Sequence, residues 1–342
     1  MIMEVAAVGR ALVTKGIFEY EIRMGGEGAR YQILVVGVGE VAETHLRVLE
    51  RIPGADVVAG VDIAAKPGLT FRGHSVPLYR TPQDAAAHHD PDIVVIATPT
   101  PTHAAVCGQI AGCFPAARIL MEKPAADDLP GARHVLMDIG GRQPVDVAYH
   151  TAFAPEVSWG ARTVRASAGD LGSPVAVEAY FTDPYQDDFD ATSQRLGNSW
   201  IDSGINALSV LTRFVQPVKR SSLRRIGERS HSVFEAHLTC QAAGRELDAL
   251  ILTSWHVTDR AKTTRIRYSS GAELVMDHTA VAGYLTRSGR VTAIFGSGRA
   301  IPRRERHYLA LYQWWLGEGN PIMPDETSIR LHELLLQPGG NA

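Results

Sequence analysis

The fold of this chain is decided by residues 33–42, which read ILVVGVGEVA. Four consecutive apolar residues are typical of a strand that is buried on both faces of a parallel sheet. A turn with glycine at positions 37 and 39 follows, and it leads into a predicted helix over residues 42–51. In such a turn the backbone N–H groups and the positive end of the helix point at a bound pyrophosphate, and alanine is a permitted third residue at position 42. The stretch therefore predicts a dinucleotide site formed by Gly37, Val38, Gly39, Glu40 and Val41.

The residue expected to bind a ribose of the dinucleotide is Asp62. It follows a predicted strand over residues 55–61 and lies 23 positions beyond Gly39. A carboxylate at this distance can hold the ribose 2′-hydroxyl. Because a carboxylate repels a 2′-phosphate, Asp62 favours NAD over NADP, although Lys66 is close enough in sequence to keep NADP as an alternative.

The rest of the sequence predicts two domains that differ in their pattern of helices and strands. Strands over residues 92–97 and 118–121, with a helix of small residues over 103–111 between them, continue the βαβ pattern of a doubly wound parallel sheet. After residue 150 a helix is followed by strands with no helices between them, which predicts an α+β domain. These later elements are a helix over 156–166, strands over 175–181, 233–240, 247–255, 263–268, 272–276 and 291–295, and helices over 306–316 and 326–336. A basic cluster at Lys219, Arg220, Arg224 and Arg225 is predicted to be an exposed loop.

Composition and charge exclude several classes of protein. The chain has 34 Lys and Arg and 37 Asp and Glu, a formal net charge of −3, and no basic run that would indicate nucleic acid or a membrane surface as a partner. No uncharged apolar stretch approaches the roughly 20 residues of a membrane span. Three cysteines are too few for a disulfide framework, so a cytoplasmic protein is expected. His88 and His89 have no third ligand at metal spacing, so no metal site is expected.

A second group of candidate residues lies where two of the predicted strands end. The strand over 92–97 breaks at a turn, TPTPTH over 98–103, and the strand over 118–121 ends in the sequence MEKP. Ligands of doubly wound folds bind at this carboxyl edge of the sheet. A lysine there, Lys123, can hydrogen-bond a substrate oxygen, and burial can lower its pKa enough for proton exchange. The expected cofactor contacts at this edge are Thr98, Pro99, Thr100, His103, Glu122 and Lys123.

These motifs, over residues 37–42, 97–103 and 122–124, resemble those of the glucose-fructose oxidoreductase, inositol dehydrogenase and rhizopine-catabolism family (Gfo/Idh/MocA). The resemblance runs from about residue 32 to about residue 335. It implies a Rossmann domain, an α+β domain with a large open, mainly antiparallel sheet, and hydride transfer between NAD(P) and a carbon of a sugar, inositol or related polyol. It also implies that Lys123 lies against the oxygen of the reacting carbon, and that the open sheet is buried in a homodimer or homotetramer.

The C-terminal half gives a finer indication in residues 200–208, WIDSGINAL. Asp202 and Asn206 are four residues apart, so on a helix both side chains can enter one site. Most of the family carries Asp and His at this spacing, and the loss of the imidazole removes a group that could take the hydroxyl proton. The variant resembles the aldose 1-dehydrogenase branch, and so do residues 149–155, in which His150 matches a pocket histidine. The anomeric hydroxyl of an aldose is more acidic than an ordinary alcohol and tolerates a weaker base.

The residues therefore predict a site in which Lys123, Asp202 and Asn206 are catalytic and His150, Tyr149 and Trp200 contact a small carbohydrate. The best prediction is an NAD(P)-dependent aldose 1-dehydrogenase. One alternative is a reductase of keto-sugars or keto-cyclitols in natural-product biosynthesis, because Ala152 stands where the sugar dehydrogenases often have Arg. Another is a non-catalytic sugar or dinucleotide sensor, which the retained Lys123 and Asp202 disfavour.

The predicted domain organisation has four parts: an N-terminal extension over 1–31, a Rossmann domain over 32–150, an α+β domain for substrate binding and oligomerisation over 151–336, and a tail over 337–342. Family members usually begin their first strand within a few residues of the start. The extra residues here are expected to be either an added pair of strands or part of a reading frame that truly begins at Met24.

Overall fold

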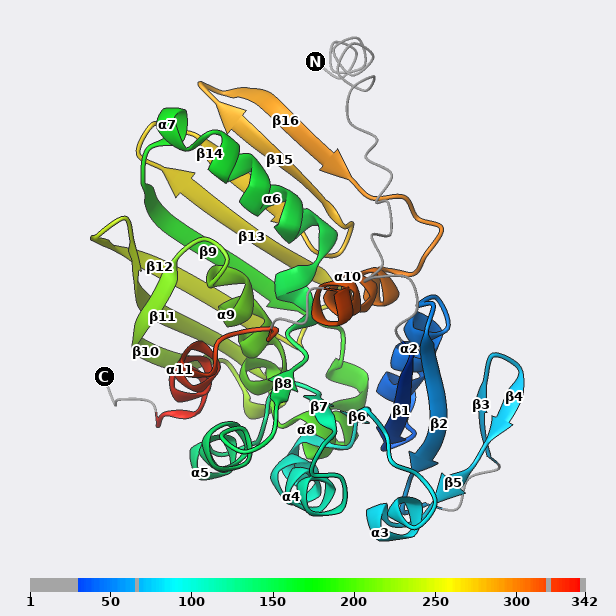
Figure 1. Cartoon of the computed structure of the whole chain (residues 1–342). Helices are drawn as coiled ribbons and strands as arrows, with labels where there is room; N and C mark the ends of the chain where they lie inside the picture. The colour runs from blue at the N-terminus through cyan, green and yellow to red at the C-terminus, as the bar shows by residue number, and fades with distance from the viewer. Residues whose placement is uncertain (1–29, 65–67, 318–320, 339–342) are drawn as a thin grey trace.

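The structure, a computed structural model, describes residues 30–64, 68–317 and 321–338. It has two large β-sheets (Figure 1): a parallel sheet coloured blue to green and a second sheet coloured green to orange. The expected fold class, a Rossmann sheet followed by an α+β domain, is confirmed. The predictions for Met24 and Lys66 lie outside the described residues, as do those for all but the last two positions of the N-terminal extension.

The first sheet has six strands, all parallel, in the order β5-β2-β1-β6-β7-β8. They are β1 (Tyr31–Val36), β2 (Ala55–Val61), β5 (Leu78–Tyr79), β6 (Ile93–Ile96), β7 (Arg118–Met121) and β8 (Val145–Val147). Every residue of β6 is fully buried, which is why this strand is a continuous apolar run without alternation. The strand order reverses between β1 and β6, so the segments after these two strands meet at the carboxyl edge of the sheet, where ligands bind in such folds.

Helices and a small hairpin accompany this sheet. They are α2 (Glu40–Leu49), β3 (Leu69–Phe71), β4 (His74–Val76), α3 (Pro82–Ala86), η2 (Thr100–Thr102), α4 (His103–Cys113), α5 (Leu129–Arg133) and η3 (His134–Ile139). The helix α2 begins two residues earlier than predicted, directly after Gly39. Glu40 and Glu43 lie in its first turn, where acidic side chains are favoured by the helix dipole.

The second sheet has eight strands in the order β10-β11-β12-β9-β13-β14-β15-β16. They are β9 (Pro174–Thr182), β10 (Gln216–Ile226), β11 (Val233–Ala242), β12 (Arg245–Ser254), β13 (Ala261–Tyr268), β14 (Glu273–Asp277), β15 (Ala282–Arg287) and β16 (Arg290–Gly296). Only the pairing of β9 with β12 is parallel. In the strand order of this sheet, β9 is the fourth of eight strands and so lies near its centre. The turn after β9 carries Asp183, which lies near the candidate active site.

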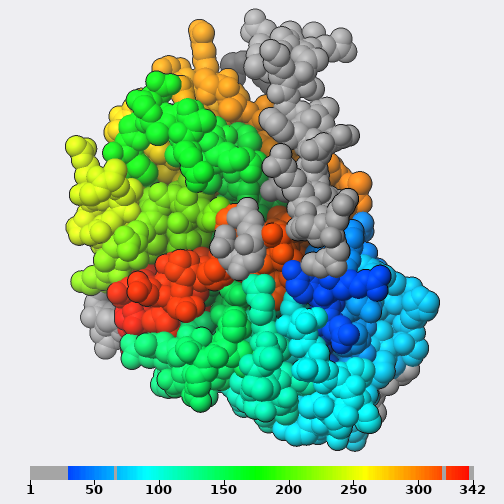
Figure 2. Space-filling view, viewed as in Figure 1, coloured from blue at the N-terminus to red at the C-terminus, as the bar shows by residue number. Residues whose placement is uncertain are grey.

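The helices of the C-terminal part connect the two sheets. They are η4 (His150–Phe153), α6 (Pro155–Ala166), α7 (Ala168–Leu171), η5 (Gln186–Asp188), α8 (Phe189–Leu196), η6 (Trp200–Gly204), α9 (Ile205–Leu211), η7 (Arg229–His231), α10 (Arg303–Gly317) and α11 (Asp325–Leu336). The helix α6 lies across β14, β15 and β16 (Figure 1). In the space-filling view the red α11 lies between the two parts of the molecule (Figure 2), and it packs on both α5 and α9. The helix α10 packs on α2 and η4.

Two strands of the second sheet, β10 and β15, were not predicted. The basic cluster at residues 219–225 was expected to be an exposed loop, and this was wrong, because it lies on β10. Arg220 is buried and donates hydrogen bonds to the carbonyls of Leu334, Leu335 and Gln337. As an edge strand β10 carries many charged residues, which hide the alternation that identifies a strand.

Within residues 30–64, 68–317 and 321–338, no helix is long and apolar enough to cross a membrane. In the same ranges no three His, Cys, Asp or Glu side chains are grouped so that they could hold a metal ion.

Candidate active site

The glycine-rich turn between β1 and α2 has the shape that a dinucleotide requires. Gly37 has φ +83°, and a Cβ atom there would lie 2.8 Å from the backbone nitrogen of Thr98. Gly39 has an ordinary extended conformation, and a Cβ atom there would meet nothing within 4 Å. No side chain caps the first turn of α2, so the N–H groups at its start face this open space. The shape of the turn leaves room for the pyrophosphate of NAD at residues 37–41, and binding there stays a prediction.

The carboxylate of Asp62 lies at the same turn. Its Oδ2 accepts a hydrogen bond of 2.8 Å from the backbone N–H of Val38, and its Oδ1 accepts one of 2.9 Å from Ala64. These hydrogen bonds fix Asp62 beside the glycine-rich turn, and its contact with a ribose stays a prediction.

Gly39→Ala should weaken NAD binding without changing the stability of the fold. The added methyl group meets no protein atom and the backbone conformation suits alanine, so the melting temperature should stay that of the wild type. The methyl group would occupy the space next to the pyrophosphate, and we expect the dissociation constant for NAD to rise by about tenfold or more. Calorimetric titration with NAD and a thermal melt measure the two effects.

Gly37→Ala is the matched comparison for that experiment. It forces a residue with a side chain into a positive φ and against Thr98, so it should lower the free energy of unfolding by about 1–2 kcal/mol or more. Unchanged NAD affinity in Gly39→Ala would exclude the turn as the cofactor site.

The turn after β6 is held in place by His103. Its two ring nitrogens lie 2.7 Å from the carbonyl oxygen of Pro124 and 2.8 Å from that of Thr98, and the side chain is 1% exposed. His103 therefore joins the turn to the segment after β7, with both ring nitrogens already engaged. Thr100 is buried as well, whereas Thr98 is half-buried and Pro99 exposed. Of the four predicted cofactor contacts in this turn, Thr98 and Pro99 are the accessible ones.

Glu122 lies in a buried hydrogen-bonded network that joins the first sheet to α2 and α10. Its Oε1 lies 3.0 Å from Nε2 of His45 and accepts a hydrogen bond of 2.5 Å from the hydroxyl of Tyr308. The other ring nitrogen of His45 lies 2.8 Å from the hydroxyl of Tyr312. Burial alone would raise the pKa of Glu122, but the hydrogen bonds from His45 and Tyr308 and the charge of Lys123 outweigh it and lower the pKa.

Glu122→Gln should destabilise the protein in a pH-dependent way. Because the folded pKa of Glu122 is below its ordinary value of 4.5, its contribution is fully present above about pH 4.5 and is lost as pH falls through the folded pKa. At pH 7 we expect the free energy of unfolding to fall by about 2 kcal/mol. Below pH 4.5 the variant should lose less stability on acidification than the wild type, as measured by urea unfolding. The exposed Glu246→Gln serves as the control, and parallel pH curves for wild type and Glu122→Gln would contradict this account.

The structure brings Lys123 and Asp202 into direct contact. Lys123 follows β7, and Asp202 lies in η6 of the second domain. The Nζ atom of Lys123 is 2.6 Å from Oδ1 of Asp202 and donates a second hydrogen bond of 2.9 Å to the carbonyl of Asp202. Burial by itself would lower the pKa of Lys123, but the carboxylate of Asp202, with a smaller contribution from Glu122, raises it above its ordinary value. Lys123 is therefore an ammonium group, contrary to the expectation that burial would lower its pKa.

Asn206 lies one helical turn after Asp202 and is tied into the protein on both sides. Its Nδ2 donates to the carbonyl of Asp202 at 3.2 Å, and its Oδ1 accepts from the hydroxyl of Thr151, also at 3.2 Å. The neighbouring His150 is half-buried and stacks on Tyr308 with ring centroids 4.5 Å apart. Burial, followed by the electrostatic effects of His307 and Lys123, holds the pKa of His150 well below its ordinary value. His150 is thus a neutral imidazole beside the Lys123–Asp202 pair.

Tyr149 and Trp200, the other two predicted substrate contacts, face the protein core. The indole N–H of Trp200 donates a 2.9 Å hydrogen bond to the carbonyl of Leu335, and its side chain is 2% exposed. Tyr149 is fully buried, and its ring lies 6.5 Å from that of His332. Both side chains therefore pack against α11. Large aromatic residues beside a functional motif are commonly core residues. Tyr149 and Trp200 are of this kind, because their side chains are buried away from any substrate.

Sequence reasoning missed a second charged group next to this pair. Asp183 follows β9, and its Oδ2 lies 2.7 Å from Nζ of Lys262, while its Oδ1 accepts a hydrogen bond of 2.5 Å from Nε of Arg260. The hydroxyl of Ser203 lies 3.2 Å from Asp183 and 3.5 Å from Asp202, so it bridges the two carboxylates. These residues meet because β13 pairs with β9, a contact that no local pattern in the sequence reveals.

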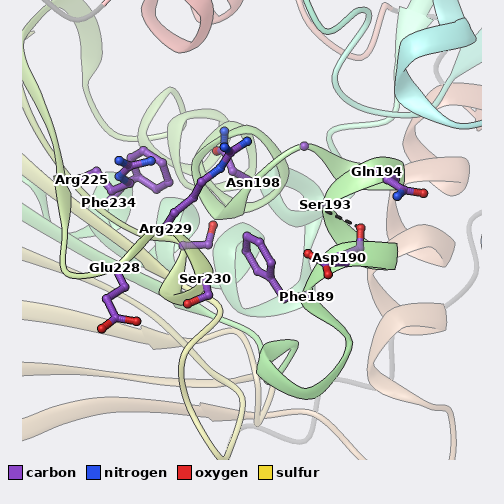
Figure 3. Close-up of a pocket in the computed structure, with 12 residues that line it drawn as sticks. Phe189, Asp190, Ser193, Gln194, Asn198, Arg225, Glu228, Arg229, Ser230 and Phe234 are labelled. Atoms are coloured by element: carbon purple, nitrogen blue, oxygen red, sulfur yellow. Dashed lines mark hydrogen bonds between the residues drawn. The ribbon is translucent and has the colours of Figure 1, made fainter.

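A separate cavity of about 960 Å³ lies between α8 and the loop that joins β10 to β11. Figure 3 shows Phe189, Asp190 and Ser193 on α8 on one side of it and Arg225 and Phe234 on the other. None of its lining residues belongs to the group around Lys123 and Asp202.

Comparison with known proteins agrees with this description. Residues 31–139 match the Gfo/Idh/MocA family model, described as an oxidoreductase family with an NAD-binding Rossmann fold. The chain is 29% identical over 181 residues to the rhizopine catabolism protein MocA of Rhizobium meliloti, an alignment that covers 52% of this chain and 55% of that protein. It is 25% identical over 266 residues to an inositol 2-dehydrogenase of Rhodococcus erythropolis, covering 72% of each. The alignment thus spans about half the length of the first of these relatives.

A solved structure with the same fold is that of the UDP-N-acetylglucosamine 3-dehydrogenase GnnA from Acidithiobacillus ferrooxidans. It superimposes with a TM-score of 0.70 at 18% identity, covering 91% of this chain and 97% of that one. At this identity the likeness shows the fold alone. The family model, the relatives and the two-sheet architecture agree, and residues 31–139 are an NAD-binding Rossmann domain of the Gfo/Idh/MocA oxidoreductase family.

Proposed function

We propose that this protein is an NAD-dependent dehydrogenase that oxidises a CH–OH carbon of a sugar or cyclitol. The observation that carries the proposal is the 2.6 Å contact between Lys123 and Asp202. It joins a residue at the carboxyl edge of the Rossmann sheet to a residue of the second domain. A substrate hydroxyl placed against this pair would lie at the edge of the sheet where the cofactor binds.

The roles of the side chains follow from their charges. When bound, NAD supplies a nicotinamide ring that takes up the hydride. The ammonium group of Lys123 donates a hydrogen bond to the substrate oxygen and stabilises the negative charge that grows on it as the C–H bond breaks. The carboxylate of Asp202 orients Lys123 and accepts the hydroxyl proton. The neutral His150 and the amide of Asn206 position the neighbouring hydroxyl groups.

The finer proposal is oxidation at the anomeric carbon of an aldose. Both polar atoms of the Asn206 side chain are engaged by protein groups, and an amide cannot act as a base at neutral pH. A site without an imidazole at this position suits a hydroxyl that is more acidic than an ordinary alcohol, as the anomeric hydroxyl is.

A second candidate is the reverse reaction, reduction of a keto-sugar or keto-cyclitol. The raised pKa of Lys123 favours it, because an ammonium group can donate its proton to a carbonyl oxygen as that oxygen becomes an alcohol.

The predicted homodimer or homotetramer is also a proposal, to be checked by light scattering of the purified protein.

An absorbance screen for reduced nicotinamide tests the proposal. Purified protein is mixed with NAD or NADP and a panel of aldoses and inositols, and with the reduced cofactors and keto-sugars. We expect NAD to be reduced by at least one aldose. Activity only in the reductive direction would replace aldose oxidation by the second candidate, and binding of NAD without turnover of any compound would favour a sensor.

A further inference from the structure

Three cations, Arg260, Lys262 and Arg303, lie within electrostatic range of Asp183, which is connected to the Lys123–Asp202 pair. Arg260 and Lys262 share Asp183, which Ser203 connects to Asp202. Lys262 is nearly buried, and its ammonium group also lies 5.9 Å from the ring centre of Phe181. Removing charges from water is costly unless opposite charges compensate for it. Because Arg260 and Lys262 share the single carboxylate of Asp183, the free-energy cost of removing the two positive charges from water is only partly offset within the protein.

The third cation is Arg303, at the start of α10. It is half-buried, and within the described part of the chain its guanidinium group makes no hydrogen bond and no ion pair. The next residue, Arg304, differs, since it pairs with Glu40 at 3.1 Å beside the glycine-rich turn. Asp183 and, less strongly, Glu156 attract Arg303. Asp183 is already paired with Lys262 at 2.7 Å, and Oε1 of Glu156 lies 2.8 Å from Nδ1 of His278. Among residues 30–64, 68–317 and 321–338, Arg303 is therefore a cation with no hydrogen-bonded or ion-paired partner of its own.

The position of Arg303 on α10 places it at the proposed site. Arg303 and His307 are four residues apart and share a face of the helix. The ring centre of His307 lies 5.9 Å from that of His150. The charges of Lys123, Arg303 and Lys262 all help to lower the pKa of His150, after the larger effects of burial and His307. Lys123, Arg303 and Lys262 therefore lie within electrostatic range of His150, on three different parts of the fold.

We propose that the substrate carries a carboxylate or phosphate group, and that Arg303 and Lys262 bind this group while Lys123 and Asp202 hold the hydroxyl that is oxidised. A guanidinium group is suited to this task because it binds either anion through two parallel hydrogen bonds. The bound anion would also supply the negative counter-charge that Arg303 lacks when no substrate is bound. This inference rests on the proposed function and narrows its substrate from neutral sugars to anionic ones.

Matched substrate pairs test the proposal on the wild-type protein. With NAD present, kcat/KM is measured for glucose and glucuronate, galactose and galacturonate, glucose and glucose 6-phosphate, and myo-inositol and an inositol monophosphate. We expect an anionic member to exceed its neutral partner by about 30-fold or more, as for hydrogen bonds to a charged group. The pairs also distinguish a carboxylate from a phosphate. Equal or higher kcat/KM for the neutral members would overturn the inference and leave the proposed function standing.

Arg303→Gln tests the assigned residue. The ratio of kcat/KM for the anionic member to that for the neutral member should fall by about 30-fold, mainly through KM, and Arg303→Lys should restore part of it. The exposed Arg299→Gln, four residues earlier, should keep the wild-type ratio. A loss of NAD affinity in Arg303→Gln, with the substrate ratio unchanged, would assign Arg303 to the cofactor and overturn the proposal.

A binding measurement separates failure of this inference from failure of the proposed function. If no compound is turned over, calorimetric titration of the NAD-loaded protein with glucuronate, with glucose 6-phosphate and with inorganic phosphate still tests the anion site. Binding that Arg303→Gln abolishes would support the anion site although the proposed oxidation had failed. Absence of such binding would overturn the anion site as well.

Discussion

Lys123→Met should lower kcat about 10³-fold, a typical contribution of a positioned proton donor or acceptor. The variant keeps the length of the side chain but loses the ammonium group that contacts Asp202 at 2.6 Å. NAD affinity should change far less, because the pyrophosphate and the ribose are held at residues 37–41 and at Asp62. Turnover of the best substrate from the screen and calorimetric titration with NAD measure the two effects.

The control for this variant is Lys219→Met, which removes an exposed lysine from β10. Lys123→Met leaves the buried Asp202 without its cation, so a thermal melt must show that the variant is folded at the assay temperature. A folded Lys123→Met with at least a third of the wild-type kcat would remove Lys123 from the mechanism.

Asp202→Asn should lower kcat about 10²-fold, since the amide can orient Lys123 but cannot accept a proton. It should also change the pH profile. Without the carboxylate, burial is no longer outweighed, so the pKa of Lys123 falls and Lys123 loses its proton at a lower pH than in the wild type. A kinetic step that needs protonated Lys123 should therefore fail at lower pH in the variant.

The measurement is kcat against pH for the wild type, Asp202→Asn and the exposed Asp187→Asn, which should follow the wild type. An unchanged profile with a reduced kcat would show that Asp202 does not set the pKa of Lys123. A wild-type kcat in Asp202→Asn would exclude it as the base.

The features that could be predicted from the sequence are those determined by neighbouring residues. The glycine-rich turn is one example, because the strand, the positive φ of Gly37 and the start of α2 are all specified within about ten positions. Asp62 could be placed because the next strand of a βαβ unit ends at the same edge of the sheet. Lys123 and Asp202 were singled out by their motifs, and the structure brings them together.

The features that could not be predicted depend on distant pairing. Asp183 and Lys262 are 262 − 183 = 79 positions apart in the sequence. They meet only because β9 and β13 lie side by side. Arg303, which we propose binds the substrate, lies on α10, and α10 returns to pack on α2 and η4. Trp200 was predicted to contact substrate because its ring could stack on a sugar ring, but it is buried and its indole N–H bonds to α11.

The central claim is that Lys123 and Asp202 hold the hydroxyl that is oxidised by NAD. The most direct test is the formation of reduced nicotinamide, followed by absorbance, when the wild type and Lys123→Met are mixed with NAD and the panel of neutral and anionic sugars. The account predicts reduced nicotinamide with the wild type and a rate about 10³-fold lower with a folded, NAD-binding Lys123→Met. Equal rates for the two proteins, or no reaction in either direction by a wild-type protein that binds NAD, would contradict it.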